Sequence, residues 1–345
     1  MRRITVKKMQ IAGRGLIAAA ALFLTAATAA MAQGPYHVAA KWQPGGDMGW
    51  DYMGVDPVSR DLYITRRNQV MVLNSKTGKL IAEMTGFKGT HGVVFDTDGK
   101  TGFITDGGAN DVAVFNRKTF KVEMTIPTEP GPDGVVFDPY THSVWTFNGH
   151  SSSTTVIDAR TKKVLANVAL PGRPEFPVSD GKGNIYDNLE STSQIVRLNA
   201  KTHKITAVWD LKPCESPSGL AIDARHERLF SVCHNGMMAI VNAKTGKVIA
   251  TPAIGLGPDA ARFVANGQYA IASSGASGTM TIIHEDSPNH YTTVETLPTA
   301  PSARTMAMMP DGSKLFTVAA KFGPRPKHGW PKMVPGTFEV LEITK

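Results

Sequence analysis

Short apolar runs alternate with polar turns along most of the chain. Clear copies of the turn are NSKTGKLI at residues 74–81 and NAKTGKVI at residues 242–249, and related copies begin at Asn116, Asp158 and Asn199. Two alternating apolar runs joined by a turn rich in Asn, Thr, Gly and Lys predict a β-hairpin. The polar side chains supply local hydrogen bonds, and the lysines keep the turn in water.

The hairpins belong to a longer repeat. A Val-Asp or Phe-Asp pair, or a related pair, precedes each hairpin and recurs about every 40–43 residues, with its aspartates at Asp56, Asp96, Asp138, Asp180 and Asp223. Each repeat predicts four short strands; in the second they cover residues 92–95, 101–105, 111–115 and 121–126. Four strands separated by turns are typical of one blade of a β-propeller.

We therefore predict an all-β fold, a seven-bladed β-propeller, with blades starting near residues 50, 91, 133, 175, 218, 259 and 302. The last repeat stops at its third strand, residues 337–343, whereas residues 36–42 form an orphan strand within a closing segment, residues 33–49. We expect this N-terminal strand to pair with the last blade and close a single domain spanning residues 33–345. A solenoid of hairpins is the alternative, but it needs end caps that the sequence lacks.

The first 32 residues have the features of a secretory signal peptide. A basic start is followed by an apolar stretch at residues 16–29 and by a small-x-small cleavage site, AMA at 30–32. The stretch is short for a membrane span, so we expect a periplasmic or secreted monomer with no span after cleavage. Removing the five basic residues of this segment lowers the formal net charge from +8 to +3 (8 − 5). Bulk charge therefore gives little support to nucleic-acid binding.

The NxxTGKV hairpins, the PxGVxFD strand starts and the signal peptide resemble the YncE-like family of exported propellers, which is built on the YVTN repeat. The similarity covers essentially all of the chain after residue 32. It implies a periplasmic or secreted binding module, and single-stranded DNA is a ligand within the family. It carries no catalytic motif over to this sequence, because one fold hosts many functions.

Irregular, charged residues stand at the starts of the predicted innermost strands. Aligning the repeats places these residues at equivalent positions: Asp51, His91, Asp133, Glu175, Ser218, Asp259 and Arg304. In a closed propeller they would form a ring at the mouth of the central channel and are candidate ligand-binding residues. Four of them, His91, Asp133, Glu175 and Asp259, are candidate ligands of a divalent metal ion. Mutual repulsion could also make one carboxylate a general base, whereas the plain alternative is a polar mouth on a water-filled channel.

Two further features lie on the same predicted face. A proline-rich insertion at residues 321–336 offers cations together with an aromatic ring, and Lys327 and Trp330 are candidates for contacting phosphates, bases or sugars. The alternative is a loop that merely covers the last blade. Cys214 and Cys233 fall on one face of one blade, which favours a disulfide over a metal site.

These features predict an exported propeller that binds a ligand or partner on the face bearing the strand-one starts. The partner could be a small molecule, a protein or a single-stranded nucleic acid, or another anionic ligand. The alternative is a metal-dependent hydrolase or lyase that uses the ring. The sequence has no Ser-His-Asp triad, phosphate loop or CxxCH motif, so binding is favoured over catalysis.

Overall fold

The computed structural model describes residues 1–3, 5, 34–327, 329 and 331–345, and the unit considered below spans Gly34–Lys345. The predicted signal peptide lies almost entirely outside the described residues, as does Trp330. Within the described part of the chain, no helix is long and apolar enough to cross a membrane. The helical element described there is the short 3-10 turn η1, Glu190–Thr192.

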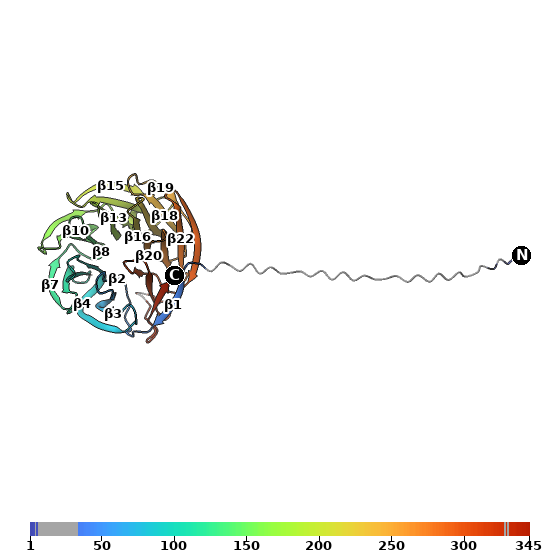
Figure 1. Cartoon of the computed structure of the whole chain (residues 1–345), viewed down its shortest axis with the longest axis horizontal. Helices are drawn as coiled ribbons and strands as arrows, with labels where there is room; N and C mark the ends of the chain where they lie inside the picture. Colours follow the sequence, from blue (N-terminus) through green and yellow to red (C-terminus); the bar gives the residue numbers. More distant parts are fainter. Residues whose placement is uncertain (4, 6–33, 328, 330) are drawn as a thin grey trace. The chain divides into compact units, whose positions relative to one another are not determined.

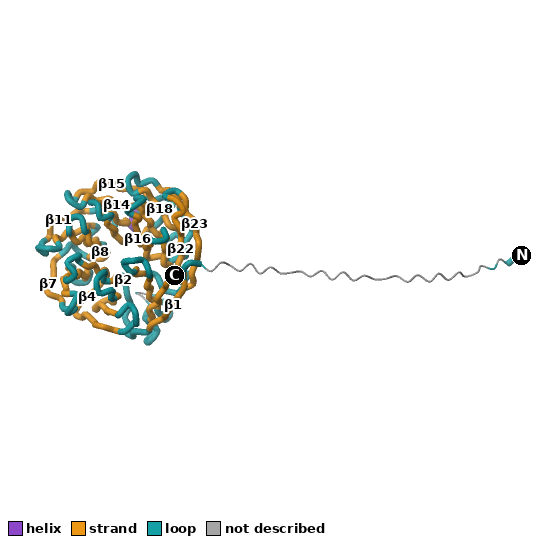
Figure 2. Tube along the Cα trace, viewed as in Figure 1, coloured by secondary structure: helices purple, strands orange, loops and turns teal. Residues whose placement is uncertain are grey.

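The described residues form six β-sheets arranged in a ring, which Figures 1 and 2 show end-on. One sheet has six strands, β2 (Met53–Val55), β3 (Leu62–Leu73), β4 (Leu80–Phe95), β5 (Thr101–Asp106), β6 (Asp111–Asn116) and β7 (Val122–Pro127). The next contains β8 (Pro132–Asp138), β9 (Ser143–Asn148), β10 (Ser153–Asp158) and β11 (Val164–Ala169). The third contains β12 (Pro174–Ser179), β13 (Asn184–Leu189), β14 (Gln194–Asn199) and β15 (Lys204–Asp210).

The remaining three sheets complete the ring. They contain β16 (Pro217–Asp223), β17 (Arg228–Cys233), β18 (Met237–Asn242) and β19 (Val248–Ala250); then β20 (Pro258–Val264), β21 (Tyr269–Ser274), β22 (Thr279–Ser287) and β23 (His290–Pro298). The last joins β24 (Met306–Met308), β25 (Lys314–Ala319) and β26 (Glu339–Thr344) to the N-terminal strand β1 (His37–Trp42). The inner strands lie side by side round the channel in the order β2, β4, β8, β12, β16, β20 and β24, and β24 contacts β2 again.

The prediction of seven blades is wrong, because the first two repeats share the six-stranded sheet and leave a ring of six. β4 contains both the fourth strand of the first repeat and the first strand of the second, and the pairing of Arg67 with Thr90 continues the ladder. The sequence explains the merger. The crossings that follow β7, β11, β15, β19 and β23 each contain proline, whereas residues 84–91 contain none. Proline lacks the backbone N–H that pairs neighbouring strands, so a segment without proline can continue as one strand.

The N-terminal strand closes the ring, as the orphan strand predicts. β1 pairs antiparallel with β26, from His37 opposite Thr344 to Trp42 opposite Val340. Trp42 packs on Phe316 with ring centroids 5.7 Å apart. A core cluster joins β3 of the first sheet to β25 and β26 of the last, so burial of apolar surface seals the same joint.

The polar turns form hairpins for the reason that the sequence suggests. The side-chain Oδ1 of Asn74 accepts hydrogen bonds from the backbone amides of Lys76 (3.0 Å) and Thr77 (3.1 Å). The same two bonds recur at the later turns, which begin at Asn116, Asp158, Asn199 and Asn242. These local bonds reverse the chain between successive strands.

Candidate functional site

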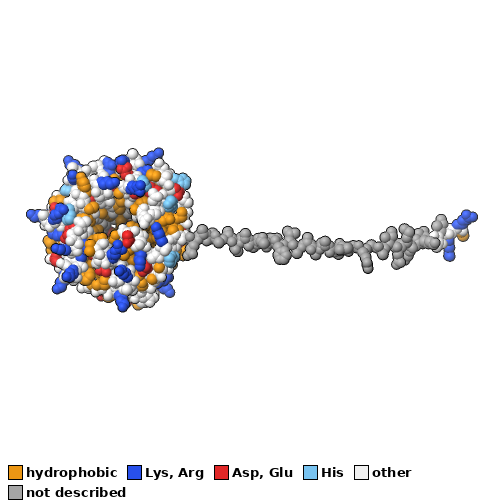
Figure 3. Space-filling model, viewed as in Figure 1, with side chains coloured by type: hydrophobic (Ala, Val, Ile, Leu, Met, Phe, Trp, Pro, Cys, Tyr) orange, Lys and Arg blue, Asp and Glu red, His pale blue; other side chains and the backbone are white. Residues whose placement is uncertain are grey.

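The residues predicted to surround the channel mouth lie at the starts of the inner strands. His91 lies in β4, Asp133 in β8, Glu175 in β12, Ser218 in β16 and Asp259 in β20, while Asp51 and Arg304 stand just before β2 and β24. Figure 3 shows that the molecule is hollowed at the centre of the ring. Because the inner strands are neighbours round the channel, residues from seven places in the sequence meet there.

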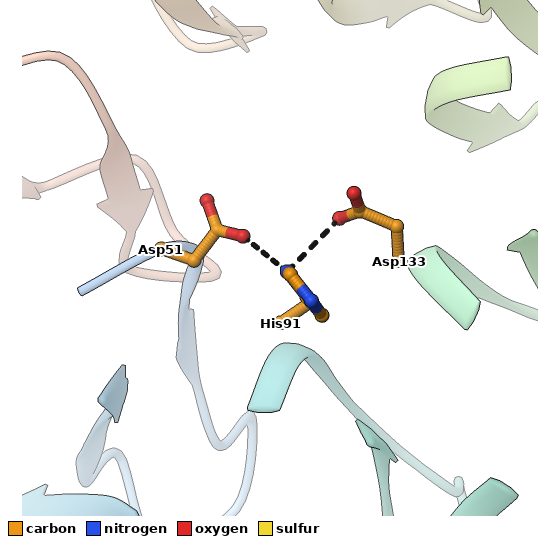
Figure 4. Close-up of side chains that lie close together, drawn as sticks. All are labelled: Asp51, His91 and Asp133. Atoms are coloured by element: carbon orange, nitrogen blue, oxygen red, sulfur yellow. Dashed lines mark hydrogen bonds and ion pairs between the residues drawn. The ribbon is translucent and has the colours of Figure 1, made fainter. Parts of the chain in front are cut away.

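His91 bridges two carboxylates from different repeats (Figure 4). Its Nδ1 forms a 2.5 Å hydrogen bond with Oδ2 of Asp51 and lies 3.5 Å from Oδ1 of Asp133. Burial disfavours the charged imidazole, but the hydrogen bond to Asp51 and the charges of both carboxylates outweigh it and raise the pKa of His91 to about 9. At neutral pH this side chain is therefore a cation between two acids.

Arg304 links the other members of the ring. Its guanidinium is paired with Asp259, lies 3.7 Å from Oδ1 of Asp51, and donates to the carbonyl oxygen of Trp50 at 3.1 Å. Asp259 in turn accepts a 2.8 Å hydrogen bond from the hydroxyl of Ser218. Six of the seven predicted positions thus form one continuous chain of contacts, and Glu175 is the exception.

Asp133 and Glu175 are the acids that the network leaves without full compensation. Burial, followed by the negative charge of Asp51, raises the pKa of Asp133 to about 7. Burial and the charges of Asp133 and Asp259 raise the pKa of Glu175 well above its usual range. Among the described residues, the cation paired with Glu175 is Arg173, 3.9 Å away, and Arg173 is itself paired with Glu190.

The metal ligands predicted from the sequence do not meet as one set. Asp51, His91 and Asp133 place one ligand atom each within 4.8 Å of one another. Glu175 and Asp259 lie against arginines and stand outside that group. The His91 nitrogen that a metal ion would need is hydrogen-bonded to Asp51, so the arrangement resembles a protonated ion-pair network more than a ligand shell.

Below the ring, two aromatic side chains and an arginine form a floor. Tyr52, next to Asp51, meets Phe176, next to Glu175, edge-to-face with centroids 5.0 Å apart. The guanidinium carbon of Arg262 lies 5.2 Å from the centre of the Phe176 ring. All three also line a cavity of about 460 Å³ whose other walls are mostly apolar residues of β2, β4, β8 and β12. The charged ring therefore lies at one end of an apolar channel.

The insertion of the last repeat reaches the ring through one aromatic contact. Phe322 pairs with Met333 across the base of residues 321–336, and its ring packs 5.7 Å from that of Trp50. Trp50 also provides the carbonyl oxygen bound by Arg304. Lys327 is exposed near the tip, whereas Trp330 lies outside the described residues.

The two cysteines belong to one repeat, Cys214 in the loop before β16 and Cys233 at the end of β17. Cys214 and Cys233 are joined by a disulfide with Cα atoms 5.5 Å apart, and both are buried beside Leu211 and Leu220. Their environment is apolar.

Sequence reasoning missed a second charged cluster at the opposite ends of the strands. Asp223, His226 and Glu285 bring three potential ligand atoms within 4.8 Å of one another. The lysine-rich turns at that end of the strands indicate a solvent-exposed surface, so no buried charged cluster was predicted there. A signal was present: in the sixth repeat the segment HEDSPNH, residues 284–290, replaces the usual NxxT turn.

The comparisons with known proteins show the fold. No protein-family model and no curated protein matches the chain. A chain of Kuenenia stuttgartiensis hydrazine synthase is similar in structure with a TM-score of 0.71 and 12% identity, covering 79% of this chain and 93% of that one. The WD40 repeats of RRP9 have a TM-score of 0.75 and 10% identity, covering 90% of this chain and 99% of that one. The structure of U3-55K has a TM-score of 0.74 and 10% identity, covering 89% of this chain and 98% of that one. A β-propeller is thereby shown, whereas the YncE-like resemblance remains a prediction.

Proposed function

We propose that this protein is a binding propeller that receives a cationic group of a small ligand or partner protein at the channel mouth. The observation that carries the proposal is the pair of acids Asp133 and Glu175. The ring has four carboxylates but two cationic members, and Arg304 and His91 are engaged with Asp259 and Asp51. The remaining two acids are only partly compensated, because His91 and Arg173, the cations beside them, each lie closer to another acid.

The position of these acids suits binding of a cation. Their side chains are 27% and 16% exposed, so a ligand can reach them while water is partly excluded. Opposite charges attract more strongly where water is excluded. One oxygen of Asp133 is buried with no hydrogen-bond partner among the described residues, so the protein does not satisfy this carboxylate fully. A ligand ammonium or guanidinium group could donate to the exposed part of the same carboxylate.

An anionic ligand such as single-stranded nucleic acid fits the ring less well, because its phosphates would face the uncompensated acids. Such a ligand would instead need the exposed cations of the insertion, namely Lys321, Arg325, Lys327 and Lys332. The acidic ring therefore favours a cationic ligand, whereas the basic insertion favours an anionic one.

A titration with spermidine and with a lysine-rich peptide tests the proposal. We expect both to bind the parent protein, and Asp133→Asn with Glu175→Gln to weaken binding at least about tenfold, the loss of roughly one charge-assisted contact. The matched control, Glu83→Gln with Glu123→Gln, removes the same charge from exposed positions on outer strands and should leave affinity unchanged. Binding of single-stranded DNA that depends on Lys327 would overturn the proposal.

The pH dependence offers an independent check. Because the pKa of Asp133 is raised to about 7, this acid is neutral below pH 7 and negative above it. Affinity for a permanent cation should therefore rise as pH increases through 7. The Asp133→Asn variant should lose that rise, and a pH-independent parent would contradict the assignment.

A second candidate is acid–base catalysis, the alternative raised by the sequence. A carboxyl group with a pKa of about 7 is suited to act as a general base at neutral pH, and His91 stands beside it as a cation.

A metal-dependent hydrolase or lyase would use Asp51, His91 and Asp133 as its ligands. Screening ester, phosphoester and lactone substrates with and without added Zn²⁺ tests it: turnover abolished by Asp133→Asn would support it, and no turnover would reject it.

The disulfide also supports the proposal that the chain is exported to the periplasm or secreted, since such bonds persist in oxidising compartments. Fractionation of cells that produce the full chain tests export. Accumulation in the cytoplasm with two free thiols would contradict it.

A further inference from the structure

A buried cluster of one histidine and two carboxylates lies far from the channel-mouth ring. Asp223 ends β16, the strand whose start bears Ser218, so the cluster and the ring occupy opposite ends of the same strand. His226 belongs to the turn that follows β16, and Glu285 belongs to β22 of the next sheet. The cluster therefore spans the joint between two sheets.

The ligand atoms of this cluster lie within ion-pair distance of one another. Nδ1 of His226 lies 2.7 Å from Oδ2 of Asp223 and 3.4 Å from Oε1 of Glu285. None of these atoms has a hydrogen-bond partner among the described residues, and neither does the second oxygen of Glu285. Asp223 is 5% exposed and Glu285 is fully buried. Leaving such groups unsatisfied in the interior is costly, so something must compensate them.

An equivalent joint in the same protein shows one way in which such an aspartate is compensated. Arg117 follows β6 and pairs with the buried carboxylate of Asp56 across the joint between the first two repeats. Its backbone amide bonds to the carbonyl of Lys100, the residue before β5, and the amide of Glu285 bonds in the same way to Gln268, the residue before β21. Glu285 therefore occupies the place of Arg117.

At the joint between the fifth and sixth repeats, a carboxylate therefore stands where the joint between the first two repeats has the guanidinium of Arg117. Asp223 corresponds to Asp56, so two acids face each other with only His226 between them. The nearby Arg228 does not neutralise them, since its guanidinium donates to the carbonyl oxygens of His226, Glu227 and Pro288 and to Asn289. The positive charge at this joint must therefore come from the His226 imidazolium or from a bound ion.

We propose that Asp223, His226 and Glu285 bind a divalent transition-metal ion of the Zn²⁺ type, which joins the fifth repeat to the sixth as Arg117 joins the second to the first. Two ligands about 2.1 Å from a metal ion stand about 3.0 Å apart at a right angle and about 3.4 Å apart at the tetrahedral angle. The observed separations of 2.7 and 3.4 Å approach these values. One imidazole with two carboxylates suits Zn²⁺ or Mn²⁺ better than Mg²⁺ or Ca²⁺.

The ring cluster of Asp51, His91 and Asp133 has similar separations, but its histidine is hydrogen-bonded to Asp51. Nδ1 of His226 has no such bond among the described residues. Its side chain is 22% exposed, which leaves a path for the ion and for a water molecule as a further ligand.

The test uses the full chain, stripped with EDTA and titrated with ZnCl₂ by calorimetry, with thermal melts in parallel. We expect one equivalent of Zn²⁺ to bind and to raise the melting temperature. Glu285→Gln should weaken binding at least about tenfold, by the scale of losses seen even for outer-shell partners. Glu285→Arg recreates the pair of Arg117 with Asp56, so it should keep the fold stable, abolish Zn²⁺ binding and make the melt insensitive to EDTA.

The control is His290→Gln, which alters a neighbouring exposed histidine bound to Asp286 and should leave Zn²⁺ affinity unchanged. Should the Glu285 variants fail to fold, anomalous scattering at the zinc edge from crystals of the parent locates the ion directly. The proposal is overturned if stripped parent protein binds no Zn²⁺, if Glu285→Arg binds it as the parent does, or if the anomalous peak lies elsewhere.

Discussion

The buried pair of Asp56 and Arg117 allows a sharp test of what holds neighbouring repeats together. Arg117 donates from Nε to Asp56 at 2.7 Å, donates from Nη2 to its other oxygen, and donates from Nη1 to the carbonyl of Asp96 at 2.9 Å. The residues Arg117 and Asp56 are 5% and 1% exposed. Replacing Arg117 with Met keeps an apolar stem in place but leaves the carboxylate of Asp56 buried without its cation.

Breaking one side of a buried ion pair typically costs about 3–5 kcal/mol. The lower end applies here, because Asp56 retains hydrogen bonds from the backbone amides of Val58 (2.7 Å) and Ser59 (3.2 Å). We therefore expect Arg117→Met to lower the free energy of unfolding by about 3 kcal/mol. For a domain spanning Gly34–Lys345, this loss corresponds to a fall of roughly 5 °C in melting temperature.

Thermal melts of four proteins measure the effect: the parent, Arg117→Met, Asp56→Asn and the double variant. The double variant should be less destabilised than the sum of the single ones, because the amide that replaces the Asp56 carboxylate has no charge to be left unpaired. Lys118→Met, at the exposed neighbouring position, serves as the matched control and should melt within about 2 °C of the parent. A parent-like melt for Arg117→Met, or strictly additive losses, would refute the reasoning.

The same pair sets a pH dependence. Burial pushes the pKa of Asp56 upward, but the hydrogen bonds and charge of Arg117 and the turn amides outweigh it, so the folded-state pKa is lowered. A lowered pKa contributes stability that is present above the unfolded value of about 3.9 and is lost as pH falls through the folded value. The difference in the free energy of unfolding between the parent and Arg117→Met should thus be constant near neutral pH and should shrink in acid.

Two further predictions concern the ring closure and the channel mouth. Deleting residues 36–42 from a chain that begins at Gly34 would remove β1 and expose the edge of β26, so we expect aggregation or loss of the cooperative melt; a soluble deletion that melts like its parent would contradict this role. Because the pKa of His91 is raised to about 9, its contribution to stability is present below about pH 6.5, the unfolded value, and is lost as pH rises through about 9. His91→Gln should flatten the pH dependence of the melting temperature in that window, and an NMR titration of His91 with a midpoint near 6.5 would refute the assignment.

The repeating local pattern was enough to predict the strands, the hairpins and the closing partner. Asn74 and its counterparts bond to amides two and three residues ahead, so each turn is specified within its own segment. The equivalence of Asp51, His91 and Asp133 also followed from the sequence, because residues at one repeat position lie at one place round a ring. The number of sheets did not follow, since it depended on whether backbone pairing continued through residues 84–91.

Which charges meet was decided by the tertiary structure. Glu175 and Asp259 are equivalent in sequence to Asp133, yet one lies by Arg173 and the other is paired with Arg304 from the next repeat. The cluster of Asp223, His226 and Glu285 unites residues up to 62 positions apart (285 − 223) across a joint between sheets. A repeat specifies its own hairpins through short-range bonds, whereas side chains on separate sheets become neighbours only when packing brings the sheets together.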